Sequence, residues 1–193
     1  MIKIWYVFCN FAPIITLFMK TRFFLIIPVL IITFFSCNLD SSNNYTPQII
    51  INRPFNQNGD SLKLFLTDTG GELRLDTIHV GDTISISLIL NAYSNNLTAF
   101  YLKQSSSTAS EVILPDKEEM DSVFITGSDY NSGKFLMKGD SPILFFPFKY
   151  IAKEISNEAK ISFTVVSDAK FDIGFGSNTA TLAIKTPIIS NKK

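Results

Sequence analysis

The sequence predicts an all-β fold, an antiparallel β-sandwich of short strands. Apolar and polar residues alternate with period two in several segments, and turn residues separate these segments roughly every 8–12 residues. After residue 37, no stretch keeps the helical period of about 3.6 residues over three turns. We therefore expect the sandwich to occupy residues 48–187 and to be followed by a tail, residues 188–193.

An apolar segment ahead of the domain is typical of an export signal. Residues 23–35 are almost entirely apolar, follow Lys20 and Arg22, and lead through Ser36 to Cys37. This run is too short for a helix across a bilayer, which needs about 20 residues, and it suits the core of a signal peptide. We expect residues 19–36 to be a cleaved signal peptide; an uncleaved membrane anchor is the alternative.

Residues 1–18 form a second apolar run in front of this signal. Residues 19–36 alone have the length of a signal peptide, about 15–30 residues. The simplest interpretation is that translation begins at Met19 and that residues 1–18 are a mis-set start or an extension. The alternative is a membrane hairpin of both runs, but each run is short and is interrupted by Pro13 or Pro28.

The signal core, Ser36 and Cys37 together resemble the lipobox of bacterial lipoproteins. This resemblance implies cleavage before Cys37, acylation of Cys37, and export to the cell envelope with anchoring in the outer membrane. Residues 37–47 would then be a lipidated cysteine and a flexible tether, as their polar composition also indicates. Phe34 stands where the common lipobox has leucine, and an aromatic residue there resembles the lipoprotein signals of the Bacteroidota.

Four segments of the domain carry the period-two alternation. Successive side chains of a strand point to opposite faces, so apolar residues two apart share one face. Pro147 in the segment ILFFPFKYI lacks a ladder donor, which predicts an edge strand or a break at that point. Residues expected to share a buried face are Leu62, Leu64 and Leu66; Ile84, Ile86, Leu88 and Leu90; Ile161, Phe163 and Val165; and Ala180, Leu182 and Ile184.

The segment DTIHVGDTISISLILNA, residues 76–92, resembles the opening hairpin of bacterial Ig-like modules. In that pattern Gly81 takes a positive-φ turn position and Asp82 caps the turn. The later segment AKISFTVVSDAKFDIGFG resembles the closing half of such modules. The resemblance implies an Ig-like sandwich, although the Cys and Trp residues of antibody-type domains are absent.

Composition excludes several classes of function for the chain after cleavage. Removing Lys3, Lys20 and Arg22 leaves 14 Lys and Arg against 17 Asp and Glu, which is no basic footprint for nucleic acid. With a single histidine, His79, and no cysteine beyond the lipidated one, the sequence predicts no metal site and no cofactor. His79 is expected on a strand surface, without the nucleophile and acid of a catalytic set.

Candidate contact residues lie mainly between residues 116 and 140. Asp129, Asn131 and Asp140 have a weak likeness to a calcium loop, but Lys134 occupies its glycine position, so an ordinary turn is favoured. The acidic segment PDKEEMDS is expected as a solvated loop or one helical turn. Among the tyrosines, Tyr130 is the best candidate for an exposed contact.

These observations favour a non-catalytic binding or assembly module, held to the membrane by acyl chains on Cys37. The expected partner is an envelope protein or a glycan. A glycan-binding accessory lipoprotein of an uptake system is the alternative, and a small carboxylate-dependent hydrolase is a weaker one. The absence of tryptophan after cleavage favours a protein partner, since indole rings are good platforms for stacking.

Overall fold

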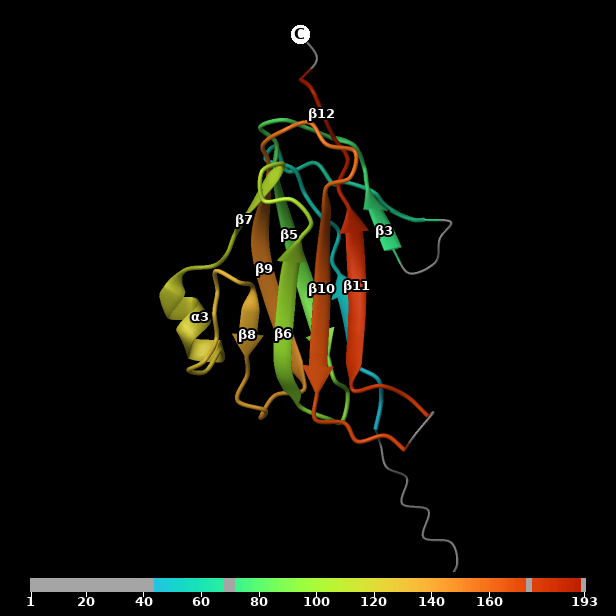
Figure 1. Cartoon of the computed structure of the whole chain (residues 1–193), viewed down its shortest axis with the longest axis vertical. Coiled ribbons are helices and arrows are strands. Elements are labelled where there is room, and N and C mark those ends of the chain that lie inside the picture. The colour runs from blue at the N-terminus through green and yellow to red at the C-terminus, as the bar shows by residue number, and fades with distance from the viewer. Residues whose placement is uncertain (1–43, 68–71, 173–174, 192–193) are drawn as a thin grey trace, which may run out of the picture. The chain divides into compact units, whose positions relative to one another are not determined.

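Strands make up most of the regular structure in the residues that the computed structural model describes, which are 44–67, 72–172 and 175–191. Two main sheets pack face to face as a sandwich-like core (Figure 1). The all-β prediction is thereby confirmed at the level of a mostly β, sandwich-like fold. The predicted extension, signal peptide and lipidated cysteine (residues 1–37) lie outside the described residues.

One main sheet has four antiparallel strands in the order β1-β5-β9-β7. The other has six strands in the order β2-β3-β11-β10-β6-β8, antiparallel except where β11 pairs with β3. A short parallel pair, β12 with β4, lies beside them. The strands are β1 (Gln48–Ile51), β2 (Leu64–Leu66), β3 (Glu72–Leu75), β4 (Ile78–His79), β5 (Thr83–Asn91), β6 (Leu97–Gln104), β7 (Ser110–Ile113), β8 (Lys134–Leu136), β9 (Ile143–Ala152), β10 (Lys160–Ser167), β11 (Thr179–Lys185) and β12 (Ile188–Ile189).

The core lies between the inner faces of the two main sheets. The predicted inward residues of β5 and β10 are all buried, with exposed fractions of 2% or less. Phe100 of β6 lies among three other phenylalanine rings, with centroids 5.3 Å from Phe135, 5.0 Å from Phe146 and 6.3 Å from Phe163. Since Phe146 belongs to the opposite sheet, these ring contacts tie the two sheets together.

Two other alternating segments agree with the prediction only in part. In β11, Ile184 is buried as expected, but Leu182 is only partly buried. In β2, Leu66 is 80% exposed, so its predicted burial is wrong. The physical reason is that β2 is a three-residue strand at the outer edge of the wider sheet, and Leu66 lies at its end.

Pro147 breaks no strand, because β9 runs unbroken from Ile143 to Ala152 between β5 and β7. Its partner in β5 is Ser87, whose carbonyl accepts a hydrogen bond from Asn52 on the other side of that strand. Pro147 therefore occupies a non-hydrogen-bonded position towards β5, and its missing N–H faces the side of β7. The pairing of β7 with β9 ends at Ile113, which is opposite Lys149, so no strand lies beside Pro147 on that side. The missing N–H of Pro147 therefore costs no hydrogen bond of the sheet.

The described domain extends beyond both predicted boundaries, 48 and 187. Ile188, expected in the tail, belongs to β12 and is fully buried. At the other end, the Asn44 side chain donates to the Lys170 carbonyl and accepts from the Lys170 N–H. Residues 44–47, expected in the tether, therefore belong to the domain, and residues 188 and 189 do so as well. A two-residue strand and a side-chain anchor leave no periodicity from which to predict them.

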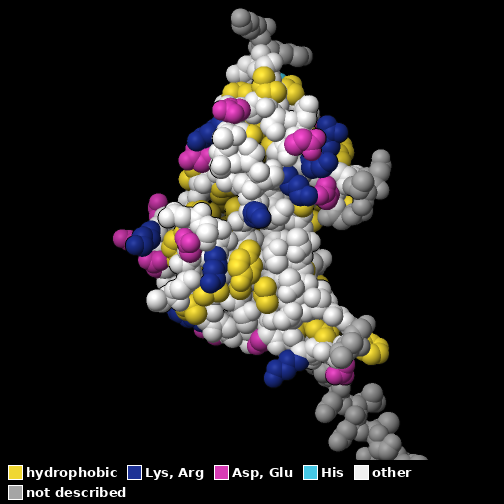
Figure 2. All heavy atoms as spheres, viewed as in Figure 1, with side chains coloured by type: hydrophobic (Ala, Val, Ile, Leu, Met, Phe, Trp, Pro, Cys, Tyr) yellow, Lys and Arg dark blue, Asp and Glu magenta, His cyan; other side chains and the backbone are white. Residues whose placement is uncertain are grey.

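The described chain has one helix, α3 (Lys117–Val123), in the connection between β7 and β8. It is longer than the single turn that the sequence predicted, and Met120 fixes it to the core while its acidic residues face solvent. Figure 2 shows these acidic side chains on the side of the molecule where α3 lies. No helix within the described residues has the length and apolar character needed to span a membrane.

Candidate functional site

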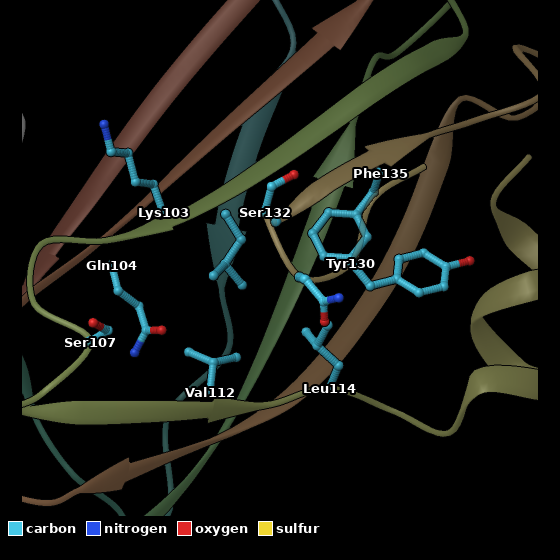
Figure 3. A pocket seen from close by; sticks show the side chains of 11 residues that line it. Lys103, Gln104, Ser107, Val112, Leu114, Tyr130, Ser132 and Phe135 are labelled. Atoms are coloured by element: carbon cyan, nitrogen blue, oxygen red, sulfur yellow. The ribbon is translucent and has the colours of Figure 1, made fainter. Parts of the chain in front are cut away.

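A cleft opens between the end of β6 and the segment that follows α3 (Figure 3). Its volume is about 490 Å³, within the usual range of about 300–1,000 Å³ for small-molecule sites. Its more buried lining is apolar and comes from Leu102, Val112, Leu114 and Phe135. The lining thus brings together both main sheets and the turn before β8.

The short length of β8 creates this cleft. β8 pairs with β6 only as far as Tyr101, and beyond it the Leu102 N–H donates to the Gly133 carbonyl. Gly133 has a φ of +70°, and a Cβ there would lie 1.9 Å from the Leu102 carbonyl oxygen. Only glycine permits this close approach, so Gly133 fixes the wall of the cleft.

Two side-chain amides are among the hydrogen-bonding groups that line the cleft. Gln104 projects into it, as Figure 3 shows, and its Nε2 donates to the carbonyl and hydroxyl of Ser110 at 3.2 and 3.1 Å. The Oε1 of Gln104 accepts no hydrogen bond within the described part of the chain. The side-chain amide of the exposed Asn131 makes no hydrogen bond there either. Lys103 points its ammonium group away from the cleft. The cleft therefore offers mainly uncharged donors and acceptors above a few buried apolar side chains.

Tyr130, the predicted contact residue, is half-buried and forms one side of the cleft. Its ring stacks on Phe135 with centroids 5.8 Å apart and meets the edge of Phe124 at 6.3 Å. The hydroxyl points towards α3 (Figure 3) and donates to Asp121 at 2.8 Å. Burial, together with this carboxylate, raises the pKa of Tyr130. The ring, and not the hydroxyl, is thus the part of Tyr130 that lines the cleft.

The three residues with a calcium-loop pattern do not converge on one point. Asp129 accepts hydrogen bonds from the backbone N–H groups of Ser132 and Asn131, at 3.3 and 3.1 Å. The side chain and backbone of Ser132 lower the pKa of Asp129, so its carboxylate acts as the cap of its own turn. Asp140 lies in an exposed turn beyond β8, and no contact links it to Asp129. The described residues contain no group of three His, Cys, Asp or Glu side chains suited to a metal ion.

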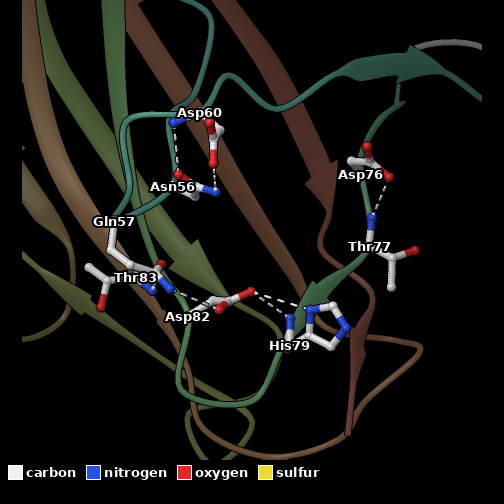
Figure 4. Close-up of polar contacts among 8 residues, drawn as sticks. All are labelled: Asn56, Gln57, Asp60, Asp76, Thr77, His79, Asp82 and Thr83. Atoms are coloured by element: carbon white, nitrogen blue, oxygen red, sulfur yellow. Dashed lines mark hydrogen bonds and ion pairs between the residues drawn. The ribbon is translucent and has the colours of Figure 1, made fainter. Parts of the chain in front are cut away.

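His79 and Asp82 form a turn network (Figure 4). The Asp82 carboxylate accepts from the His79 backbone N–H at 2.8 Å and lies 3.7 Å from the His79 ring nitrogen Nδ1. Its other oxygen accepts from the Gln57 amide, whose oxygen in turn accepts from the Thr83 N–H. Gly81 has the predicted positive φ, +92°. The arrangement caps the turn into β5 as expected, but the expected hairpin does not form, because β4 pairs with β12 and β5 with β1 and β9.

A second surface that the sequence did not predict covers the outer side of the four-stranded sheet. Ile50, Ile89 and Phe145 are register partners across β1, β5 and β9, and their side chains form a row. Phe145 is 64% exposed and its neighbour in β9, Ile143, is 45% exposed. We call this surface the apolar face; it comprises Ile50, Phe55, Ile89, Ile113, Ile143, Phe145 and Pro147.

A groove of about 560 Å³ crosses one end of the apolar face. Phe55 and Ile113 stand at its sides, with exposed fractions of 45% and 43%, while Ser85 and Ser87 lie along it. The signal for this surface was in β9, where both alternate sets of positions are largely apolar. A strand buried on one face needs only one such set.

No protein-family model matches the chain, and neither does any curated protein.

Proposed function

We propose that this chain is a lipid-anchored protein of the bacterial cell envelope, whose domain is a non-catalytic binding or assembly module. The anchor is Cys37, which follows a signal-like segment and precedes Asn44, the first described residue of the domain, by only seven positions. Two or more acyl chains would hold the protein stably, because each buried CH₂ contributes about 0.8 kcal/mol and one chain alone is marginal.

The order of the strands supports a relation to Ig-like modules. Seven strands, taken in chain order as β1, β5, β6, β7, β9, β10 and β11, occupy the positions A to G of the constant-type sandwich. One sheet then reads A-B-E-D and the other contains C-F-G, with β2, β3 and β8 as additions. Such sandwiches occur widely as binding and assembly modules, so the relation favours binding without specifying a partner.

The observation that carries the binding role is the apolar face. Four of its seven side chains, those of Ile89, Ile143, Phe145 and Pro147, stand on the central strands β5 and β9, although solvent-facing positions there need no apolar residue. Contiguous exposed apolar surface commonly marks a site of protein–protein contact. A second protein of the envelope that presents an apolar strand or helix is the partner we propose.

Site-specific photocrosslinking tests this role in bacterial cells that express the protein. p-Benzoylphenylalanine is introduced at Phe145 and, as the matched control, at Tyr101, an exposed aromatic residue on the outer side of the other sheet. We expect a discrete adduct only from position 145, and its loss when Ile143→Ser is added. Equal adducts at both positions, or none at position 145, would refute partner binding at the apolar face.

Anchoring is tested separately by metabolic labelling with an alkyne fatty acid. Wild-type protein should take up the label, whereas Cys37→Ala should not. Equal labelling of the two forms would refute acylation of Cys37.

Glycan binding is the second candidate, and the cleft is the observation that favours it. Its polar lining, with the two amides of Gln104 and Asn131 above buried apolar side chains, suits a ligand with many hydroxyl groups. Asn131→Ala should then abolish retention on the glycan, while Asn58→Ala, in an exposed turn away from the cleft, should not. The hydrolase alternative has less support, since Asp116, Glu118 and Glu119 stand exposed on or beside α3 and not in an enclosed site.

A further inference from the structure

Exposed aromatic side chains surround the point where the described chain begins. Tyr45, Tyr93 and Phe175 are 54%, 44% and 85% exposed. They lie at one end of the sandwich, where β1 and β11 begin and β5 and β10 end, and the C-terminus lies at the opposite end (Figure 1). We call this group, together with the exposed Lys170, the N-terminal pole. Phe175 is the most exposed of the large apolar residues in the described chain.

Specific contacts join these residues into one surface. The rings of Tyr45 and Tyr93 lie 5.4 Å apart, and the Tyr93 hydroxyl donates to Gln48 at 2.8 Å. The Thr46 hydroxyl accepts from the N–H of Ser177, two residues after Phe175. These contacts hold three segments together: the residues that lead into β1, the connection between β10 and β11, and the turn between β5 and β6.

The backbone is constrained beside two of these aromatic side chains. Tyr93 is the one non-glycine residue with positive φ in the described chain, at +59°. A bulky residue in this conformation is an outlier and costs roughly 1–3 kcal/mol. Next to Phe175, a Cβ at Gly176 would lie 2.5 Å from the Phe171 ring, so the chain is fitted closely beneath that ring. Tyr93 therefore remains 44% exposed in a conformation that is costly for its residue type.

The length of the chain before Asn44 limits where this pole can lie once Cys37 is acylated. Seven residue steps separate Cys37 from Asn44. At about 3.3–3.6 Å per residue, a fully extended chain spans at most about 25 Å between them. The pole therefore stays within about this distance of the lipid that holds the acyl chains, at a high local concentration of that lipid.

We propose that the N-terminal pole rests on the lipid surface and inserts Phe175, Tyr45 and Tyr93 among the headgroups. This inference rests on acylation of Cys37, as proposed above. Aromatic rings are well suited to that position, because one part of the ring system is apolar while a tyrosine hydroxyl stays hydrated. Membrane contact would also fix the direction of the sandwich, with its long axis pointing away from the bilayer.

The charges of the N-terminal pole indicate that it would contact lipid through burial of its aromatic rings more than through attraction to anionic headgroups. Lys170 is accompanied by Asp168 and Asp172, so the pole carries no excess of positive charge. One of these acids, Asp168, is engaged by the backbone and side chain of Asn96 at 2.7 and 3.2 Å. Polybasic segments bind anionic lipid by charge, whereas this surface should bind neutral and anionic bilayers about equally.

Tryptophan fluorescence tests the proposal in the acylated, full-length protein. Trp5 is the only tryptophan and precedes Cys37, so the cleaved protein has none. Phe175→Trp places a probe at the pole, and Ile155→Trp is the matched control, because Ile155 is 65% exposed and belongs to the connection between β9 and β10 at the opposite end. Each variant is reconstituted into vesicles whose phosphatidylcholine carries bromine on the acyl chains, and also into vesicles that contain phosphatidylglycerol. Mass spectrometry of the N-terminal peptide reports acylation of Cys37.

We expect blue-shifted emission from Trp at position 175 and several-fold stronger quenching than at position 155, with little change when phosphatidylglycerol is added. Acylated protein whose two probes are quenched equally would overturn membrane docking and leave the anchor intact. Quenching at position 175 that appears only with phosphatidylglycerol would overturn the aromatic mode of contact. If Cys37 carries no acyl chain, the proposed anchor fails, and this inference fails with it.

Discussion

Strands β5 and β9 lie side by side over nine register pairs, yet their outward-facing side chains differ in kind. Both strands bury apolar residues on the inner face, Ile86 in β5 and Phe146 and Phe148 in β9 among them. On the outer face, β5 places mainly polar residues and β9 mainly apolar ones; Ile89 is the apolar exception in β5, and Lys149, opposite Ser85, is the charged exception in β9. The inner faces are alike because the core excludes water, and any polar group there needs a partner. The outer faces are free to differ, so the mainly apolar outer face of β9 is a property that the fold does not require.

The largest effect on stability should come from truncating a side chain of β9 that faces the core. Phe146 is 2% exposed and contacts Phe100 and Phe135 across and within the core. Phe146→Ala should lower the free energy of unfolding by about 3–5 kcal/mol, since it removes a buried ring and leaves a cavity. Urea denaturation of the purified protein measures this change.

Phe145→Ala is the matched control, because Phe145 is the adjacent residue of the same type and is 64% exposed. It should change the free energy of unfolding by less than about 0.5 kcal/mol, as surface substitutions usually do. Similar losses for both variants would show that the two faces of β9 are equally part of the core.

The same contrast indicates how much of the fold could be predicted from sequence. The strand with Ile86 was predicted with the correct inward face, because its polar residues mark the other face unambiguously. β9 is apolar at both sets of positions, so periodicity alone could not decide which side faces the core. The place of Pro147 depends on where β7 ends, and Ile188 is buried by a strand of only two residues. Both facts come from tertiary packing.

Sequence predicted the candidate sites only in part, for a similar reason. Tyr130 was expected to be exposed because it lies in a loop, yet Phe124 and Phe135 enclose part of its ring and Asp121 binds its hydroxyl. One wall of the cleft beside it is fixed by the close approach of Gly133 to β6, which no local pattern reveals. The turn cap at Asp82 was easier to predict, since its partner lies within three residues.

A smaller effect should come from the one polar contact that β9 makes on its inner face among the described residues. The Tyr150 and Thr186 hydroxyls lie 2.6 Å apart, and both side chains are fully buried. Tyr150→Phe should lower the free energy of unfolding by about 1–3 kcal/mol, because the Thr186 hydroxyl is left buried without a partner. Adding Thr186→Val should recover much of this loss, since removing both partners can be nearly neutral. Thermal denaturation of the single and double variants tests this hydrogen bond. A double variant that is less stable than either single variant would mean that the two hydroxyls stabilise the protein through packing and not through their hydrogen bond.

The smallest effect on stability should come from the apolar face itself. Ile143→Thr combined with Phe145→Thr keeps residues with a high strand propensity and removes two exposed apolar side chains. The free energy of unfolding should change by no more than about 1 kcal/mol in total, since each surface substitution contributes about 0.5 kcal/mol or less. Because the fold remains intact, loss of a crosslinked partner from p-benzoylphenylalanine at Ile113, on the same face, would be due to the surface and not to unfolding. A loss of stability as large as that of Phe146→Ala would mean that the outer face is part of the folded core, and the difference between β5 and β9 would then reflect packing and not partner binding.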